Sequence, residues 1–197
     1  MTIISPYINI HTHNKCENEL SITTVGIHPY AAESGAKLQL QEVTSDIDAI
    51  GEIGLDFARN IDRKAQEELF EQQLSIAQQL SLPVVIHSVR AVDRTMEILK
   101  GYTLKAVIFH GFIGSSQQAQ NAIKCGYYLS FGHRCFESPK TLIALSNSQL
   151  TNIFLETDEH EISIEEIYSM AAAQREESLT EIKDQIYKNY IKLFNKR

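Results

Sequence analysis

The sequence predicts an α/β fold, a TIM-barrel-like parallel barrel, and three observations support this prediction. Short β-rich runs alternate with longer helical patterns along nearly the whole of the 197 residues. The strand-like runs are apolar and bounded by turns, which is typical of parallel strands covered by helices. No linker, internal repeat or low-complexity tract interrupts the alternation. We therefore expect residues 1–197 to form a single domain.

Seven segments have the pattern of strands, and they are residues 2–10, 21–27, 46–53, 82–87, 104–110, 126–131 and 152–157. Helical patterns occupy residues 37–43, 62–80, 90–100, 115–125 and 138–148, and then 163–174 and 178–194 after the last strand. The segment 62–80 is the clearest helix, since its apolar residues form one stripe with polar residues opposite. Seven strands are one fewer than a complete (β/α)8 barrel contains.

The shortfall lies between His13 and residue 21, where only NKCENEL connects the first two predicted strands. A parallel crossover normally takes a dozen or more residues. An extended segment of this size still reaches about 23 Å at roughly 3.3 Å per residue. We therefore expect a seven-stranded or partly open barrel in which loop alone makes the first crossover.

Composition excludes several classes of protein. The formal net charge of −7 and the pI near 5.5 argue against a DNA coat held by a broad basic surface. The amino terminus does not resemble a signal peptide, and no apolar run approaches the length of a membrane span. Cys16, Cys125 and Cys135 show no CxxC spacing, so we expect reduced thiols that bind no metal. These features favour a cytoplasmic protein.

Metal-capable side chains stand at the carboxyl ends of five predicted strands. They are His11, His13, Glu52, His87, His110 and Asp158. Parallel barrels build their active sites at this face. Taken singly, each histidine could be a hydrogen-bonded boundary residue, and the aspartate could cap a helix. Together, four imidazoles and two carboxylates would be costly to bury without a partner, which a divalent cation supplies.

The number of ligands indicates the number of ions. Six ligands exceed the need of one ion with an open position, and they suit two ions about 3.5 to 4 Å apart that share a carboxylate. Mixed nitrogen and oxygen ligands fit Zn, Mn, Co or Fe, whereas Mg usually prefers oxygen. We expect two divalent ions as cofactors, with Zn, Mn or Mg as the candidates.

Several motifs together resemble those of the TatD-like metal-dependent hydrolases, relatives of the amidohydrolases and phosphotriesterases. They run in order over most of the chain as NIHTH, VGIHPY, AIGEIGLDF, QEELFEQQLSIAQQLSLPVVIHS, FHGFIGS and IFLETD. GIHP, GEIGLD and LETD are specific in combination, far more than a single His-x-His. The resemblance implies a metal-dependent phosphodiesterase barrel with DNase activity.

The resemblance also implies a role for each ligand. His11, His13 and Asp158 bind the first ion, and His87 and His110 bind the second.

The resemblance further implies that Glu52 bridges both ions, so we count Glu52 and Asp158 as the catalytic residues. His28 of the GIHP motif lines the site and, with Arg59 and Arg90, is a candidate for substrate binding.

The chain departs from the family pattern at several points. Asn9 stands where the family has Asp, which removes a charge beside the first ion. The family's first helix and second strand, between His-x-His and GIHP, are deleted. Val89 occupies the position of a family Arg, and Arg90 follows it. After ETD the chain reads EHEISIEE instead of continuing with Ala-Pro. We expect these changes to affect substrate binding more than metal binding.

We expect hydrolysis of a phosphodiester by a metal-activated water whose proton Asp158 accepts. Nucleic acid or another phosphodiester is the expected partner, with no membrane and no obligate protein partner. Candidate phosphate contacts are Lys15, Arg59, Arg63, Arg90 and Arg134, and candidates for base stacking are Tyr30, Phe57 and Phe112. Two alternatives stay open: a hydrolase of esters, lactones or amides, and a degenerate barrel that binds metal without turnover.

Overall fold

The computed structural model describes residues 5–14 and 16–194 of the chain. These residues form two compact units, each described below by itself. We call Thr23–Phe109 the middle unit, and Met1–Ile22 with His110–Arg197 the terminal unit. The expectation of a single domain over residues 1–197 stays a prediction. In the described part of the chain, no helix has both the length and the apolar character that crossing a membrane requires.

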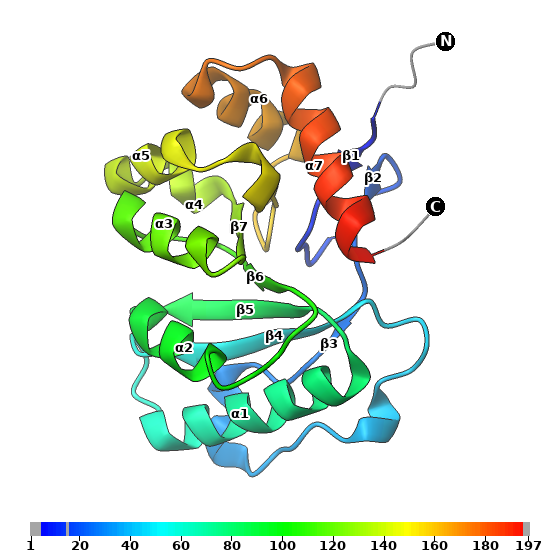
Figure 1. The fold of residues 1–197 in the computed structure, drawn as a ribbon, viewed down its shortest axis with the longest axis vertical. Helices are drawn as coiled ribbons and strands as arrows, with labels where there is room; N and C mark the ends of the chain where they lie inside the picture. The colour runs from blue at the N-terminus through cyan, green and yellow to red at the C-terminus, as the bar shows by residue number, and fades with distance from the viewer. Residues whose placement is uncertain (1–4, 15, 195–197) are drawn as a thin grey trace. The chain divides into compact units, whose positions relative to one another are not determined.

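The middle unit contains four strands in the order β3-β4-β5-β6, and the paired neighbours run parallel. Helices α1 and α2 pack against β4 and β5 (Figure 1). Its elements are β3 (Thr24–Val25), η1 (Pro29–Ser34), η2 (Leu40–Glu42), β4 (Ala49–Asp56), α1 (Arg63–Leu80), β5 (Val84–Val89), α2 (Val92–Leu99) and β6 (Val107–Phe109).

Helix α1 shows how the apolar pattern sets the packing of this unit. Asp62 caps the helix, since its Oδ1 accepts a hydrogen bond from Ala65 N at 2.8 Å. Leu69, Phe70 and Leu74 recur at helical spacing and are buried. This stripe faces β4, which places the strand bearing Glu52 on a rigid support.

Gly54 permits the close approach of β4 and β5 beside His87. Its φ is +142°, and a Cβ at this position would lie 2.1 Å from His87 O. We expect Gly54→Ala to destabilise the protein by about 1–3 kcal/mol, because the methyl group forces the two strands apart. Urea denaturation measures the change.

Gly35→Ala is the matched control for this substitution. Gly35 also has a positive φ, +73°, but an added Cβ meets no atom within 4 Å. It therefore isolates the backbone cost from the collision. Equal losses in the two variants would contradict the importance of the close approach.

In its described residues, the terminal unit combines two parallel strand pairs, β1 with β2 and β7 with β8, with five α-helices and one short 3-10 helix. Figure 1 labels the five α-helices. Its elements are β1 (Tyr7–Ile8), β2 (Glu19–Leu20), α3 (Ser116–Lys124), β7 (Tyr128–Phe131), α4 (His133–Phe136), α5 (Pro139–Asn147), η3 (Leu150–Asn152), β8 (Ile153–Leu155), α6 (Ile164–Arg175) and α7 (Leu179–Phe194).

The first strand is held in this unit by hydrogen bonds from two sides. The hydroxyl of Tyr168 donates to Ile8 O at 3.0 Å and accepts from Ile8 N at 3.1 Å. Ile10 N donates to Leu155 O at 3.2 Å. The segment that leads into His11 therefore lies alongside the end of β8.

All seven predicted strand segments contain a strand, and the predicted helices agree with α1, α2, α3, α5, α6 and α7. The count differs by one, because Glu19–Leu20 forms a two-residue strand within the segment predicted as loop alone. Asn9 N donates to Leu20 O at 2.9 Å and extends this pairing. Residues 37–43 form only the short η2, while η1, η3 and α4 were not predicted.

Candidate metal centre

His11, His13 and Asp158 converge in the terminal unit. The two Nε2 atoms lie 3.6 Å and 3.5 Å from the same oxygen, Asp158 Oδ1. The side chain of His11 is 10% exposed, that of Asp158 21% and that of His13 56%. One side of this triad is thus closed by protein, and the side of His13 is open to solvent.

A short parallel bridge brings the triad together. Asp158 N donates to His11 O at 3.1 Å, and His13 N donates to Asp158 O at 3.0 Å. Thr12, between the histidines, is the bridge partner of Asp158. Residues 11 and 13 point to one side of an extended chain, so the bridge directs both imidazoles toward the same carboxylate.

The distances in the triad fit a shared cation better than hydrogen bonds. N···O separations of 3.5 and 3.6 Å exceed the usual hydrogen-bond range. Two ligands at tetrahedral angles with bonds of 2.0–2.1 Å lie about 3.3 Å apart. The donor set of two imidazoles and one carboxylate is therefore suited to a divalent transition metal ion.

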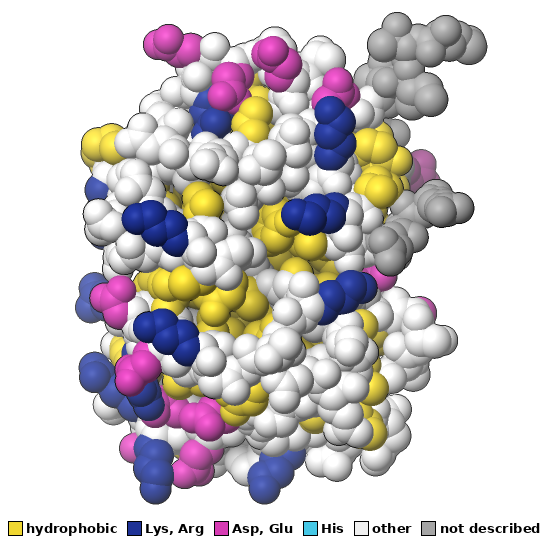
Figure 2. All heavy atoms as spheres, in the orientation of Figure 1, with side chains coloured by type: hydrophobic (Ala, Val, Ile, Leu, Met, Phe, Trp, Pro, Cys, Tyr) yellow, Lys and Arg dark blue, Asp and Glu magenta, His cyan; other side chains and the backbone are white. Residues whose placement is uncertain are grey.

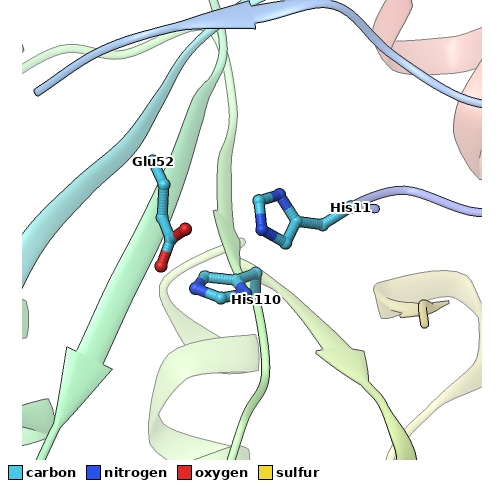
Figure 3. A group of neighbouring side chains, drawn as sticks. All are labelled: His11, Glu52 and His110. Carbon is cyan, nitrogen blue, oxygen red and sulfur yellow. The ribbon is translucent and has the colours of Figure 1, made fainter. Parts of the chain in front are cut away.

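His110 stands beside His11, and the ring centroids are 4.3 Å apart (Figure 3). Its Nδ1 lies 3.3 Å from Oε1 of Glu156, a carboxylate with no exposed surface. The same oxygen accepts the Gly111 N–H at 2.7 Å. Glu156 therefore fixes the orientation of the His110 ring by accepting a hydrogen bond from its Nδ1–H. Carboxylates have this role beside metal-binding histidines.

Burial would raise the pKa of the Glu156 carboxyl, but its surroundings have the opposite effect. The hydrogen bond from His110 and the charges of His110 and His11 stabilise the carboxylate form. The pKa of Glu156 is therefore lower than usual. An ionised Glu156 can only accept hydrogen bonds, so the proton between the two residues stays on His110 Nδ1.

In the middle unit, Glu52 projects its carboxylate from β4 (Figure 3) and meets His87 of β5. Glu52 Oε1 lies 2.5 Å from His87 Nδ1, and Asp56 Oδ2 lies 3.3 Å from His87 Nε2. If Asp56 holds the Nε2 proton, the Nδ1 lone pair faces the Glu52 carboxylate. Two acceptors 2.5 Å apart need a proton between them, and they are closer than the roughly 3.3 Å that separates two ligands of one tetrahedral ion. The contact is therefore a short hydrogen bond, and the pair would have to separate slightly to hold an ion.

Asp56 is 2% exposed and ionised. Burial would raise its pKa, but hydrogen bonds from Ala58 N, His87 and the Tyr30 hydroxyl together lower the pKa below the usual value. The Ala58 and Tyr30 bonds are 2.8 Å and 3.1 Å long. An ionised Asp56 can accept a hydrogen bond from His87 Nε2.

The hydrogen bonds of His28 favour its predicted role as a lining residue. Its Nδ1 accepts the Tyr30 backbone N–H at 3.2 Å, so the neutral ring carries its proton on Nε2. That Nε2 lies 3.3 Å from Glu52 Oε1. His28 therefore orients Glu52 by donating its Nε2 proton to the carboxylate. The lone pair on His28 Nδ1 already accepts the Tyr30 N–H.

The predicted phosphate contacts have different surroundings. The guanidinium of Arg59 lies over the Tyr30 ring at 4.9 Å and donates to its hydroxyl at 3.2 Å. Arg90 is exposed at the end of β5 with a φ of 53°. Arg134 pairs with Glu159 at 2.8 Å. Lys15 lies outside the described residues.

Charge and aromatic exposure also bear on a nucleic-acid substrate. Figure 2 shows Lys and Arg side chains singly among Asp and Glu on one face, without a broad basic patch. Tyr30 is 47% exposed, with the Arg59 guanidinium over its ring. Phe112 is 3% exposed and packs on Phe131, which makes it a core residue. Phe57 is covered by the Arg63 guanidinium at 4.4 Å.

The roles of Asp56 and Glu156 were not predicted, although both residues stand in the motifs AIGEIGLDF and IFLETD. Glu156 precedes Asp158 by two residues, and Asp56 follows Glu52 by four. Even spacing along extended chain was the available signal, because it places carboxylates on the side that carries the predicted ligands.

The sequence profile of the family described as TatD related DNase matches residues 4–195. The chain belongs to this family. Among its relatives is the metal-dependent hydrolase YjjV of Escherichia coli K12, named as uncharacterised, which is 28% identical over 195 residues, or 87% of this chain and 75% of YjjV. The 3'-5' ssDNA/RNA exonuclease TatD of Cronobacter sakazakii is 37% identical over 115 residues.

Solved structures of TatD proteins confirm the TIM-barrel-like fold class. The crystal structure of the E. coli YjjV protein has a TM-score of 0.81 and 26% identity, and the match covers 93% of this chain and 79% of that one. A TatD family hydrolase from Entamoeba histolytica has a TM-score of 0.77 at 19% identity, over 90% of this chain and 75% of its own. The chain spans only 44% of the Cronobacter TatD exonuclease.

Proposed function

We propose that this chain is a metal-dependent nuclease that hydrolyses phosphodiester bonds. The observation that carries the proposal is the convergence of His11 Nε2 and His13 Nε2 on Asp158 Oδ1 at 3.6 and 3.5 Å. Membership of the TatD family supports it, as do the relatives named as exonucleases of single-stranded DNA and RNA. Single-stranded nucleic acid is therefore the substrate class to be tested first.

Two divalent ions are part of the proposal. His11, His13 and Asp158 hold one of them. A second is assigned to His87 and His110, with Glu52 shared between the ions, and this assignment stays a prediction because it joins residues of both units. The mixed imidazole and carboxylate donors favour Zn or Mn over Mg.

Different side chains have different roles in the proposed hydrolysis. A bound divalent cation lowers the pKa of water and neutralises charge on phosphoryl oxygens. Asp158, partly exposed, accepts the proton that the attacking water loses. Glu156 and Asp56 hold the rings of His110 and His87 in fixed orientations. Arg59 supplies a positive charge, and the exposed part of Tyr30 is a candidate contact for a nucleotide base.

Metal analysis of the purified protein, followed by parallel assays, tests the proposal. We expect at least one divalent ion per chain and hydrolysis of a single-stranded oligonucleotide and bis-nitrophenyl phosphate. A chelator should abolish this activity, and added Mn²⁺ or Zn²⁺ should restore it. The simple ester p-nitrophenyl acetate should be a poor substrate.

Each other outcome has a distinct meaning. Less than one ion per chain after metal addition would contradict the metal centre. Hydrolysis of the ester alone would favour a carbonyl hydrolase. A fully metallated protein that is inactive on every substrate would favour a binding or structural role.

A further inference from the structure

Asn9 is the centre of a hydrogen-bond network beside the triad. It is 1% exposed, and its Oδ1 accepts the Thr157 backbone N–H at 3.0 Å. This bond fixes the orientation of the amide, because a backbone N–H can only donate. The Nδ2 group therefore donates one hydrogen to Thr157 Oγ1 at 2.8 Å and the other to Glu19 Oε1 at 3.0 Å.

The network continues, in the same donor-to-acceptor direction, to the segment that carries His11 and His13. Thr157 Oγ1 accepts from Asn9, so its own proton is donated to Thr12 Oγ1 at 3.0 Å. Thr12 stands between His11 and His13, and Thr157 directly precedes Asp158. The network thus joins the two backbone segments that carry the triad.

We propose that Glu19 and Asn9 form a positioning pair that sets the geometry of the metal-binding triad. The proposal rests on the proposed function, in which His11, His13 and Asp158 bind a divalent cation. Glu19 engages one N–H of Asn9 and thereby holds the amide so that its other N–H meets Thr157. The pair acts through the backbone segments and touches neither the ion nor the substrate.

This pair explains why an amide and not a carboxylate occupies position 9. An aspartate there has no N–H to give to Glu19 or Thr157. It would also place two carboxylates about as close as the present 3.0 Å contact. Glu19 lies in the short segment that follows His13, so the unusual Asn9 and the shortened crossover belong to one arrangement.

The surroundings of Glu19 allow the proposal to be tested by substitution. Asn9, Glu19 and Thr157 line a hollow of about 560 Å³ in the terminal unit, together with residues at the start of α6. Glu19 is only partly buried. A glutamine or alanine at this position therefore meets no steric obstacle.

The experiment measures Mn²⁺ affinity of the folded, metal-free protein in five forms: wild type, Asn9→Asp, Glu19→Gln, Asn9→Asp with Glu19→Gln, and Glu19→Ala. Asn9→Asp and Glu19→Ala should weaken binding about 10-fold or more, as loss of an outer partner of a metal ligand does. Glu19→Gln keeps an accepting oxygen and should stay within about threefold of wild type. The double variant should recover part of the loss, because the introduced amide donates to the introduced carboxylate, which still accepts the Thr157 backbone N–H.

Two readouts separate positioning from general stability. The kcat of Asn9→Asp on bis-nitrophenyl phosphate should return to near the wild-type value at saturating Mn²⁺, because Asp158 is unchanged. Glu17→Gln, an exposed change in the same segment, is the matched control and should bind Mn²⁺ as wild type does. A purely structural role would lower only the unfolding temperature of the metal-free protein.

The outcomes distinguish this proposal from the proposed function. Wild-type protein that does not bind Mn²⁺ would contradict both. Wild-type binding with unchanged affinity in Asn9→Asp, or a double variant no better than the single one, would overturn the positioning pair alone. If Asn9→Asp does not fold, Glu19→Ala against Glu19→Gln decides, and equal affinities would overturn the pair.

Discussion

Asp158→Asn is expected to lower the hydrolysis of bis-nitrophenyl phosphate by about 10²–10⁴-fold, the usual contribution of a positioned general base. Asparagine cannot take a proton from water, and its neutral oxygen is a weaker metal ligand. The measurement is kcat at saturating Mn²⁺, together with the metal content of the purified variant.

The fold should survive this substitution. Asp158 has a φ of 54°, a conformation that asparagine also tolerates, and its bridge to His11 and His13 uses only backbone atoms. Glu159→Gln is the matched control, since it removes the same charge from the next residue in an exposed ion pair with Arg134. An Asp158→Asn variant with wild-type kcat would show that another group is the base.

Glu156→Ala is expected to lower the free energy of unfolding by about 2–4 kcal/mol at pH 7, because it leaves a cavity and a Gly111 N–H without its acceptor. Glu156→Gln keeps an accepting oxygen and should cost less. Urea denaturation of the metal-free proteins measures both values. Equal stability of Glu156→Ala and wild type would contradict the role of this buried carboxylate.

The contribution of Glu156 should also depend on pH. Its pKa is lower in the folded protein than in the unfolded chain, where it is about 4.3. Its ionisation therefore stabilises the fold above that value, and this stabilisation is lost as the pH falls through the lower, folded pKa. The difference in stability between wild type and Glu156→Gln should shrink as the pH is lowered from 6 toward 3. A difference that is constant with pH would contradict this assignment.

Most of the fold could be predicted from the sequence, because burial imposes a periodic pattern on long elements. The apolar stripe of helix α1 and the apolar run of strand β5 can both be recognised from such a pattern. Strand β2 lacks such a pattern, since its two residues are held by pairing with β1 and by the bond from Asn9 N. The η1 turn depends on a local cap by His28, which periodicity does not report.

The candidate site could be predicted in part. Position at strand ends identified residues with metal-capable side chains. It could not distinguish the predicted ligand Glu52 from Asp56, since both residues lie on one strand and differ in which nitrogen of His87 they face. The significance of Asn9 was also hidden, because its partner Thr157 is 148 positions away.

The bridge between Thr12 and Asp158 has a consequence for biosynthesis. Thr12 is synthesised long before Asp158, so the triad cannot assemble while the ribosome is still extending the chain toward β8. Until then the two amino-terminal histidines lack their carboxylate partner. If the triad binds metal as proposed, an ion can bind there only after residue 158 has been synthesised, and a polypeptide that ends before residue 158 lacks this centre.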